Sequence, residues 1–141
     1  MAKLVWALLC RRVIVDQPSG LVSYIDSVEG FGAQQFPAPA PPIFAGTLWQ
    51  LDGHKGQSLE MRMSVLSPQG ELLVAETASL EVSHGHTRAR INVGVGGFPV
   101  PGPGRHSVRI EAKEGRNWVE HARIPLEIVL AQPFAVAPMH G

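Results

Sequence analysis

Two of the six histidines, His84 and His86, lie two residues apart near the end of a segment with strand character. Alternate residues of a strand point to the same side, so both imidazoles could reach one ion. A zinc site needs three or four ligands, and nothing in the spacing supplies the rest, although folding could bring Glu81 and His106 near. The sequence favours a polar hairpin turn here and leaves a metal site as the alternative. No cofactor is predicted.

The single cysteine, Cys10, is followed by Arg11 and Arg12, which would activate its thiol only if they shared its environment. Neighbouring side chains of a strand point to opposite faces, so Cys10 is interpreted as a small buried hydrophobe. No serine lies in a G-x-S-x-G motif, and the carboxylates show no paired spacing. His106 begins a strand with inward parity and is interpreted as a packed structural histidine. We therefore predict no catalytic residue and no enzyme activity.

Proline-rich segments with embedded aromatic residues are the features that suggest binding, because such loops can form or fill partner grooves. They occupy residues 36–42, residues 96–104 and the apolar tail at residues 132–141. The alternative is that the loops only cap the ends of the domain and that the tail is frayed. The predicted partner-binding residues are Phe36, Pro39, Pro41, Pro42, Phe98 and Phe134.

Charge excludes one class of partner. The 141 residues include twelve basic and twelve acidic side chains, and no stretch concentrates Lys and Arg with aromatic residues. Nucleic-acid binders normally show a basic face, because neutralising phosphates supplies much of their affinity. We therefore predict no nucleic-acid partner. A net charge near zero instead favours association with another protein or with a second copy.

The chain is expected to be cytoplasmic. One cysteine cannot form an intrachain disulfide, which is typical of a reducing compartment. The apolar run at residues 4–10 is similar to a short signal peptide, but arginines follow it directly and no small-x-small cleavage site is present. No run approaches the ~20 apolar residues that span a membrane, so no membrane partner is predicted.

Alternation of apolar and polar residues is the main structural signal. Leu59, Met61, Met63 and Val65 alternate with polar residues, the pattern of a strand with one buried face. Turn signals are spread along the chain, and no segment has a convincing helical pattern. Pro125 lies inside the last strand and suggests an edge position or a bulge. The predicted strands cover residues 3–15, 21–26, 43–51, 59–65, 71–75, 89–93, 106–112 and 118–130.

These segments predict an all-β fold, an immunoglobulin-like or C2-like Greek-key β-sandwich of about eight antiparallel strands. Residues 36–42 would cross between the sheets as an extended, polyproline-like segment, and residues 96–104 would form a loop. The first strand of the N-terminal hairpin is expected to be covered on both faces. A single domain is predicted for residues 1–131, followed by a tail at residues 132–141.

The N-terminal hairpin reads ALLCRRVIVD at residues 7–16 and GLVSYID at residues 20–26. With the later PP at 41–42, LW at 48–49, SPQG at 67–70 and PGRH at 103–106, it resembles an uncharacterised bacterial family of short β-rich proteins. The resemblance covers most of the chain. It implies a β-rich fold and a bacterial cytoplasmic setting, and it transfers no active-site residue. The chain departs from the family at His106, where the pattern has an aromatic residue.

Three hypotheses follow for function. The favoured one is a non-catalytic β-sandwich module for protein interaction or assembly, with another protein or a second copy as the partner. The second is a metal- or small-ligand-binding sandwich that uses His84 and His86. The third, a hydrolase on the same fold, lacks a candidate group of residues and would need His106 or His121 to meet a carboxylate and a nucleophile in a cleft.

Overall fold

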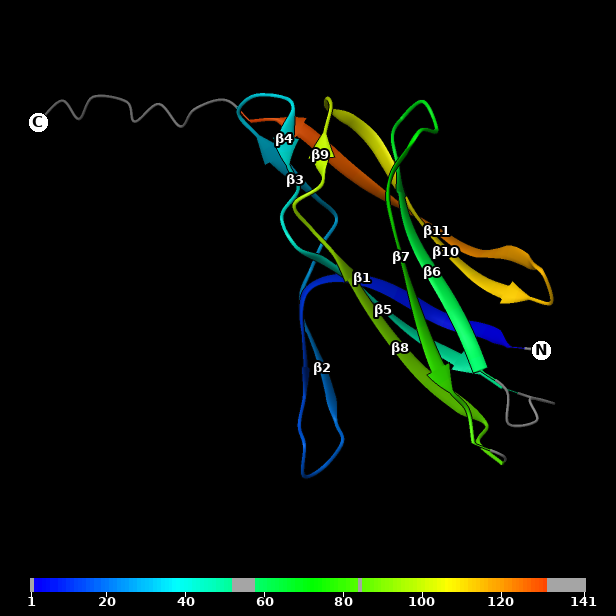
Figure 1. The fold of residues 1–141 in the computed structure, drawn as a ribbon. Coiled ribbons are helices and arrows are strands. Elements are labelled where there is room, and N and C mark those ends of the chain that lie inside the picture. The colour runs from blue at the N-terminus through cyan, green and yellow to red at the C-terminus, as the bar shows by residue number, and fades with distance from the viewer. Residues whose placement is uncertain (1, 52–57, 84, 132–141) are drawn as a thin grey trace, which may run out of the picture.

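The computed structural model describes residues 2–51, 58–83 and 85–131 as two facing sheets and a small ribbon of two short strands (Figure 1). These residues include no helix, and hence none that could cross a bilayer. Sheet A has the strand order β2 (Val22–Ser27), β1 (Lys3–Val15), β5 (Ile43–Gln50) and β8 (Arg88–Val95). Sheet B has the order β3 (Gly30–Ala33), β11 (Asn117–Leu130), β10 (Gly104–Glu114), β6 (Ser58–Leu66) and β7 (Leu72–Glu81). The predicted all-β sandwich is confirmed.

The described part of the chain has eleven strands rather than about eight. The additional ones, β3, β4 (Ala38–Pro39) and β9 (Pro99–Val100), are too short to show alternation in the sequence. One pairing is parallel, because β3 runs beside the end of β11 with Gly30 opposite Glu127. A side chain at position 30 would overlap the carbonyl oxygen of Glu127, so this close approach requires glycine.

Residues 36–42 do cross between the sheets, from β3 of sheet B to β5 of sheet A, but the two internal proline-rich segments also pair with each other, which the sequence did not predict. Ala38 of β4 lies opposite Val100 of β9. The backbone N–H of Ala40 donates to the Phe98 carbonyl at 2.9 Å, and the N–H of Gly97 donates to the Ala40 carbonyl at 2.9 Å. Because the N–H groups of non-proline residues make these bonds, the missing donors of proline do not prevent a short ribbon.

Pro125 lies at an edge position, as its sequence context suggests. On one side of β11 it faces Ser107 of β10, and on the other side β3 begins to pair only at Glu127. Proline has no N–H to donate, so it is tolerated where the strand has only one neighbour.

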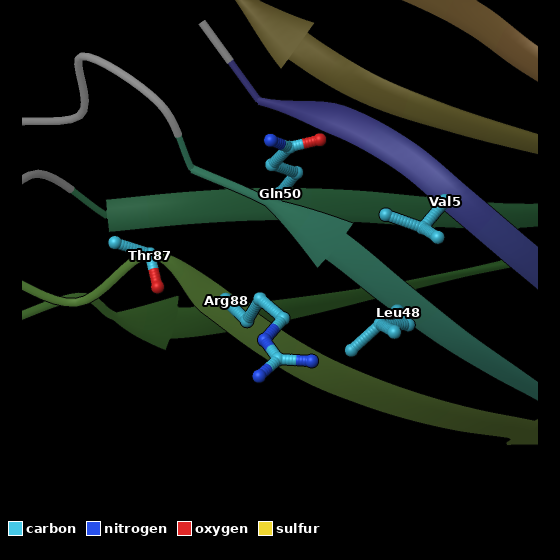
Figure 2. Close-up of a pocket in the computed structure, with 5 residues that line it drawn as sticks. All are labelled: Val5, Leu48, Gln50, Thr87 and Arg88. Atoms are coloured by element: carbon cyan, nitrogen blue, oxygen red, sulfur yellow. The ribbon is translucent and has the colours of Figure 1, made fainter.

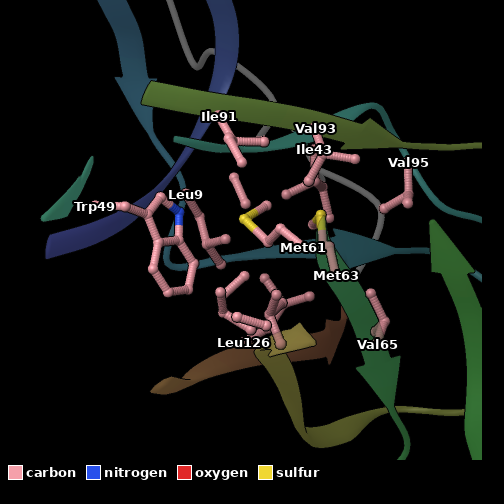
Figure 3. Close-up of a cluster of buried hydrophobic side chains, with 14 of the residues drawn as sticks. Leu9, Ile43, Trp49, Met61, Met63, Val65, Ile91, Val93, Val95 and Leu126 are labelled. Carbon is pink, nitrogen blue, oxygen red and sulfur yellow. The ribbon is translucent and has the colours of Figure 1, made fainter. Parts of the chain in front are cut away.

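The core fills the space between the sheets (Figure 3). Met61 and Met63 of β6 are fully buried there beside Trp49 of β5, as the alternation predicts. The Trp49 indole Nε1 donates to the Thr47 hydroxyl at 2.8 Å, and that hydroxyl donates to the Ile91 carbonyl at 2.6 Å. Trp49 and Thr47 therefore have hydrogen-bond partners, as burial requires, whereas the buried Ser64 Oγ and His106 Nε2 have none in the described residues.

The β1–β2 hairpin is present, but the far end of its first strand is not covered on both faces. Figure 1 shows this end projecting away from the sheets. Ile14 and Val15 are each about half exposed, at 48% and 49% of their surface, and Leu21 across the turn is 70% exposed. The prediction is wrong here because β1 continues past the end of its pairing with β5, which stops at Cys10.

Candidate functional site

The outer face of sheet A carries a layer of aromatic side chains. Trp6 of β1 and Tyr24 of β2 meet edge to face with their ring centroids 5.6 Å apart. The Tyr24 hydroxyl donates to Asn92 Oδ1 at 3.0 Å, so it ties the hairpin to β8. The Arg90 guanidinium lies 5.6 Å from the Trp6 ring centroid. This layer is possible because Gly46 has no side chain that would overlap the Tyr24 ring.

A groove lies beside this layer, between the ends of β1, β5 and β8. It is lined by Val5, Leu48, Gln50, Thr87 and Arg88, which Figure 2 draws as sticks. The hollow between them has a volume of about 320 Å³. A second hollow of about 350 Å³ shares Leu48 and Arg88 with the first and also touches Ala89 and Arg90. The two hollows meet at Leu48 and Arg88 and form one shallow groove, with two arginines and the apolar side chains of Val5 and Leu48 in its lining.

The strands around the groove carry charge of one sign. β1 contains Lys3, Arg11 and Arg12, β8 contains Arg88 and Arg90, and β5 contains no charged residue. No acidic residue lies on any of the three strands. In the part of the chain that the structure describes, the ion pairs join residues of β6, β10 and β11 in sheet B. The zero net charge of the chain therefore conceals a local excess of basic residues on β1 and β8.

The tip of the β1–β2 hairpin is held by a compact set of hydrogen bonds. The Asp16 N–H donates to the Leu21 carbonyl at 2.8 Å, and the Gly20 N–H donates to the Asp16 carbonyl at 2.7 Å. The Asp16 carboxylate accepts from both the N–H and the hydroxyl of Ser19. Gly20 has a φ of 72°, which glycine adopts without strain. The exposed apolar residues of the hairpin are thus presented on an ordered element.

Cys10 lies at the point where the hairpin leaves the sheet, and it is fully buried. Burial raises the pKa of its thiol, and hydrogen bonds from the backbone N–H groups of Arg12 and Ile25 only partly offset this. The two arginines next to it are exposed. Since the thiolate is the reactive form, the structure offers no activated nucleophile at this residue.

We expect the Cys10 thiol to react with a disulfide reagent far more slowly in the folded protein than in urea. A raised thiol pKa also means that the folded state holds its proton more tightly than the unfolded state. The titration of Cys10 therefore leaves the free energy of unfolding unchanged below the ordinary thiol pKa of 9.0 and lowers it as the pH rises above that value. Urea unfolding of wild type and Cys10→Ala between neutral and alkaline pH checks this. An equal decline in both proteins would contradict it.

The predicted partner-binding residues differ in how exposed they are in the structure. Phe98 is 6% exposed and belongs to the core, so the prediction of an exposed aromatic anchor is wrong there. Phe36 and Pro41 are half-buried, and Phe36 packs against the core. Pro39 and Pro42 are exposed. Phe134 and the predicted tail at residues 132–141 lie outside the described residues.

The histidines give no metal centre in the described ranges. His84 lies outside them, and His86 is exposed, with its backbone N–H donating to the Ser83 carbonyl at 3.2 Å. Among the described residues, no group of three or more His, Cys, Asp or Glu side chains could hold a metal ion. His106 is fully buried, with Nδ1 3.1 Å from the Gly104 carbonyl oxygen. This position agrees with a packed structural histidine.

Comparison with known proteins assigns the family but no activity. Residues 5–129 match the model of the family of unknown function DUF6941. The chain belongs to this family. The match begins at Val5 and covers both sheets of this DUF6941 domain, from the start of β1 almost to the end of β11. No curated protein matches the chain.

A solved structure supports the fold of the DUF6941 domain. The chain is similar to the crystal structure of the C-terminal domain of wzt, with a TM-score of 0.52 and 12% sequence identity. The alignment covers 94% of this chain and 76% of the other. At this identity the likeness concerns the fold alone, and it carries no ligand or partner to the DUF6941 domain.

Sequence reasoning missed the outer face of sheet A. Trp6 and Tyr24 are far apart in the chain from Asn92, and no local pattern links them. A usable signal was the pair Arg88 and Arg90, whose same parity already placed both on the face opposite Ile91.

Proposed function

We propose that this domain is a non-catalytic protein-interaction module whose contact element is the projecting β1–β2 hairpin and whose partner is a second copy of the chain. The observation that carries the proposal is the exposure of three apolar side chains at the end of one ordered hairpin: Ile14 and Val15, which are neighbours on β1 and face opposite sides, and Leu21 beside the turn. Fully burying a side chain of this size is worth about 1.5–3 kcal/mol relative to exposure. Three such residues on one element favour burial against another chain.

The order of the hairpin supports this use. Its tip is closed by backbone bonds and by the Asp16 carboxylate, which accepts from Ser19. Its strand β2 is tied to sheet A by the Tyr24 hydroxyl, 3.0 Å from Asn92 Oδ1. An element that is ordered before binding loses little conformational entropy when it binds, so more of the contact energy remains as affinity.

Charge supports a second copy as the partner. The hairpin carries Arg11 and Arg12 on β1, Asp16 at the turn and Asp26 near the end of β2. All four side chains are exposed. A two-fold contact brings the same surface of both copies together, so it needs both signs of charge on that surface. The zero net charge of the chain also leaves no overall repulsion between copies.

Size exclusion with light scattering, over a range of concentrations, tests the proposal. We expect wild type to be a dimer and the double variant Ile14→Ser with Leu21→Ser to be a monomer. Leu72→Ser is the matched control, because Leu72 is 58% exposed but lies on β7 of the other sheet. The Leu72→Ser variant should be a dimer like wild type. A wild-type monomer at every concentration, or a double variant that stays dimeric, would contradict the proposal that the partner is a second copy.

A heterologous partner is the competing outcome. If wild type is monomeric, affinity capture with the purified chain should be repeated with the double variant and the Leu72→Ser control. A stoichiometric protein that is lost only with the double variant would move the partner from a second copy to another protein.

We propose the cytoplasm as the setting, which the single cysteine of the sequence supports.

A further inference from the structure

We propose that the groove on the outer face of sheet A binds a small organic anion, a carboxylate or phosphate group carried on a short apolar body. The groove is bounded by β1, β5 and β8 and lined by Val5, Leu48, Gln50, Thr87 and Arg88, with Arg90 at its continuation (Figure 2). This site does not use the exposed residues of the hairpin tip, so it stands apart from the proposed dimer.

A β-bulge makes the hollow. The pairing of β1 with β5 shifts between Leu4 and Trp6, which leaves Val5 as the additional residue on β1. Val5 is 51% exposed at the rim of the groove. Bulges interrupt the regular packing of a sheet surface and are frequent next to binding sites, because they re-aim side chains. Here the interruption opens the sheet surface beside Leu48.

The register places basic groups in two rows around this hollow. Lys3 of β1 lies opposite Gln50 of β5, and Gln50 lies opposite Arg88 of β8. In the next row toward the centre of the sheet, Leu48 lies opposite Arg90. Alternate residues of a strand share a face and lie about 6.6 Å apart, so two guanidinium groups flank one ligand-sized space. A guanidinium can donate two parallel hydrogen bonds to a carboxylate or phosphate.

In the described residues, neither of these arginines forms an ion pair with a carboxylate. Arg88 has no ion pair there, and Arg90 contacts the Tyr24 hydroxyl at 3.4 Å and the Trp6 ring. Elsewhere in the described chain, Arg62 and Arg109 both approach Glu111, and Lys113 approaches Glu60.

The apolar lining residues and the size of the groove select the rest of the ligand. Val5 and Leu48 supply apolar surface, which favours a ligand with an apolar body over a free inorganic ion. Each hollow, at about 320 and 350 Å³, is at the lower end of the range of small-molecule sites. A ligand with one anionic group and one ring or short chain fits this combination.

Titration with phenyl phosphate, benzoate and inorganic phosphate, followed by calorimetry and by amide chemical shifts, tests the proposal. We expect saturable binding of the two aromatic anions, with inorganic phosphate about tenfold weaker because it makes no contact with Leu48. Arg88→Gln and Arg90→Gln should each weaken phenyl phosphate about tenfold, since each removes a charge-assisted hydrogen bond. Leu48→Ala should lower the preference for phenyl phosphate over inorganic phosphate.

Arg11→Gln and Arg12→Gln are the matched controls. Each removes one charge from an exposed arginine of the same sheet, outside the groove lining, and binding should be unchanged. The hairpin variant Ile14→Ser with Leu21→Ser should also bind normally, which separates this site from the proposed dimer. Circular dichroism establishes that each variant is folded.

Three results would overturn the proposal. The first is no saturable binding of any of the three anions. The second is an equal loss of binding in the groove variants and the control variants, which would indicate diffuse attraction to a basic face. The third is binding of the chain to phosphatidylglycerol vesicles without binding of the soluble anions, which would assign the basic residues to a lipid surface.

Discussion

Replacing Trp49 with alanine is expected to lower the free energy of unfolding by about 3–5 kcal/mol, the usual cost of truncating a fully buried Trp. Trp49 is completely buried between the sheets, and its ring meets His121 edge to face with centroids 5.1 Å apart. Truncation removes this packing and leaves a cavity that two hydrogen-bonded sheets cannot close easily. It also removes the donor that the Thr47 hydroxyl accepts at 2.8 Å.

Urea unfolding followed by circular dichroism measures this loss. Trp49→Phe is the matched control, because it keeps an aromatic ring and loses the indole N–H, and its cost should be near 1–2 kcal/mol. If Trp49→Ala does not fold, the control still tests the argument. A cost below about 1 kcal/mol for the alanine variant would mean that the site collapses around the missing ring.

Replacing Glu111 with alanine is expected to cost about 2–3 kcal/mol, since it removes a buried carboxylate that accepts a charge-assisted hydrogen bond from Arg62 and also approaches Arg109. The Glu111 side chain is only 8% exposed. Its Oε1 lies 2.9 Å from Nη2 of Arg62 and 3.2 Å from Nε of Arg109. Arg62 in turn stacks over the Trp118 ring at 4.4 Å from its centroid, so the carboxylate orders one side of sheet B.

Glu127→Ala is the matched control. Glu127 pairs with Arg105 at 3.4 Å, but both side chains are more than half exposed, and exposed pairs contribute about 0–1 kcal/mol. Unfolding of both variants in low and high salt separates the two situations. The Glu127 variant should lie close to wild type. Equal losses of unfolding free energy in the two variants would show that burial of Glu111 does not strengthen its ion pairs.

The alternation of residues was enough to predict the class of fold and much of the core. Met61, Met63, Ile110 and Ile128 are fully buried on inward-facing positions, as their spacing indicates. Such alternation is a local property, because each strand repeats with a period of two whatever its neighbours are. The turn at residues 67–70 was predictable for the same reason, since its sequence encodes the turn locally. There the Gly70 N–H donates to the Ser67 carbonyl at 2.9 Å.

The environment of the proline-rich segments was not predictable in this way. Proline excludes helix and regular strand, but it does not say what lies opposite. Phe98 is buried because residues 97–100 pair with residues 38–40, nearly sixty positions earlier in the chain. A pairing over that separation depends on how the two sheets bring their loops together, and no local signal records it.

By itself the sequence determined a β-sandwich with one buried face on most strands and a chain without net charge. Only the tertiary structure decided where that charge lies. The net charge is a sum over all residues, whereas the electrostatic field at a surface depends on which strands are neighbours. The order β1-β5-β8 collects basic residues on sheet A, while Glu60 and Glu111 meet their cations on sheet B. The groove and its proposed ligand follow from that separation, which arises from long-range strand pairing.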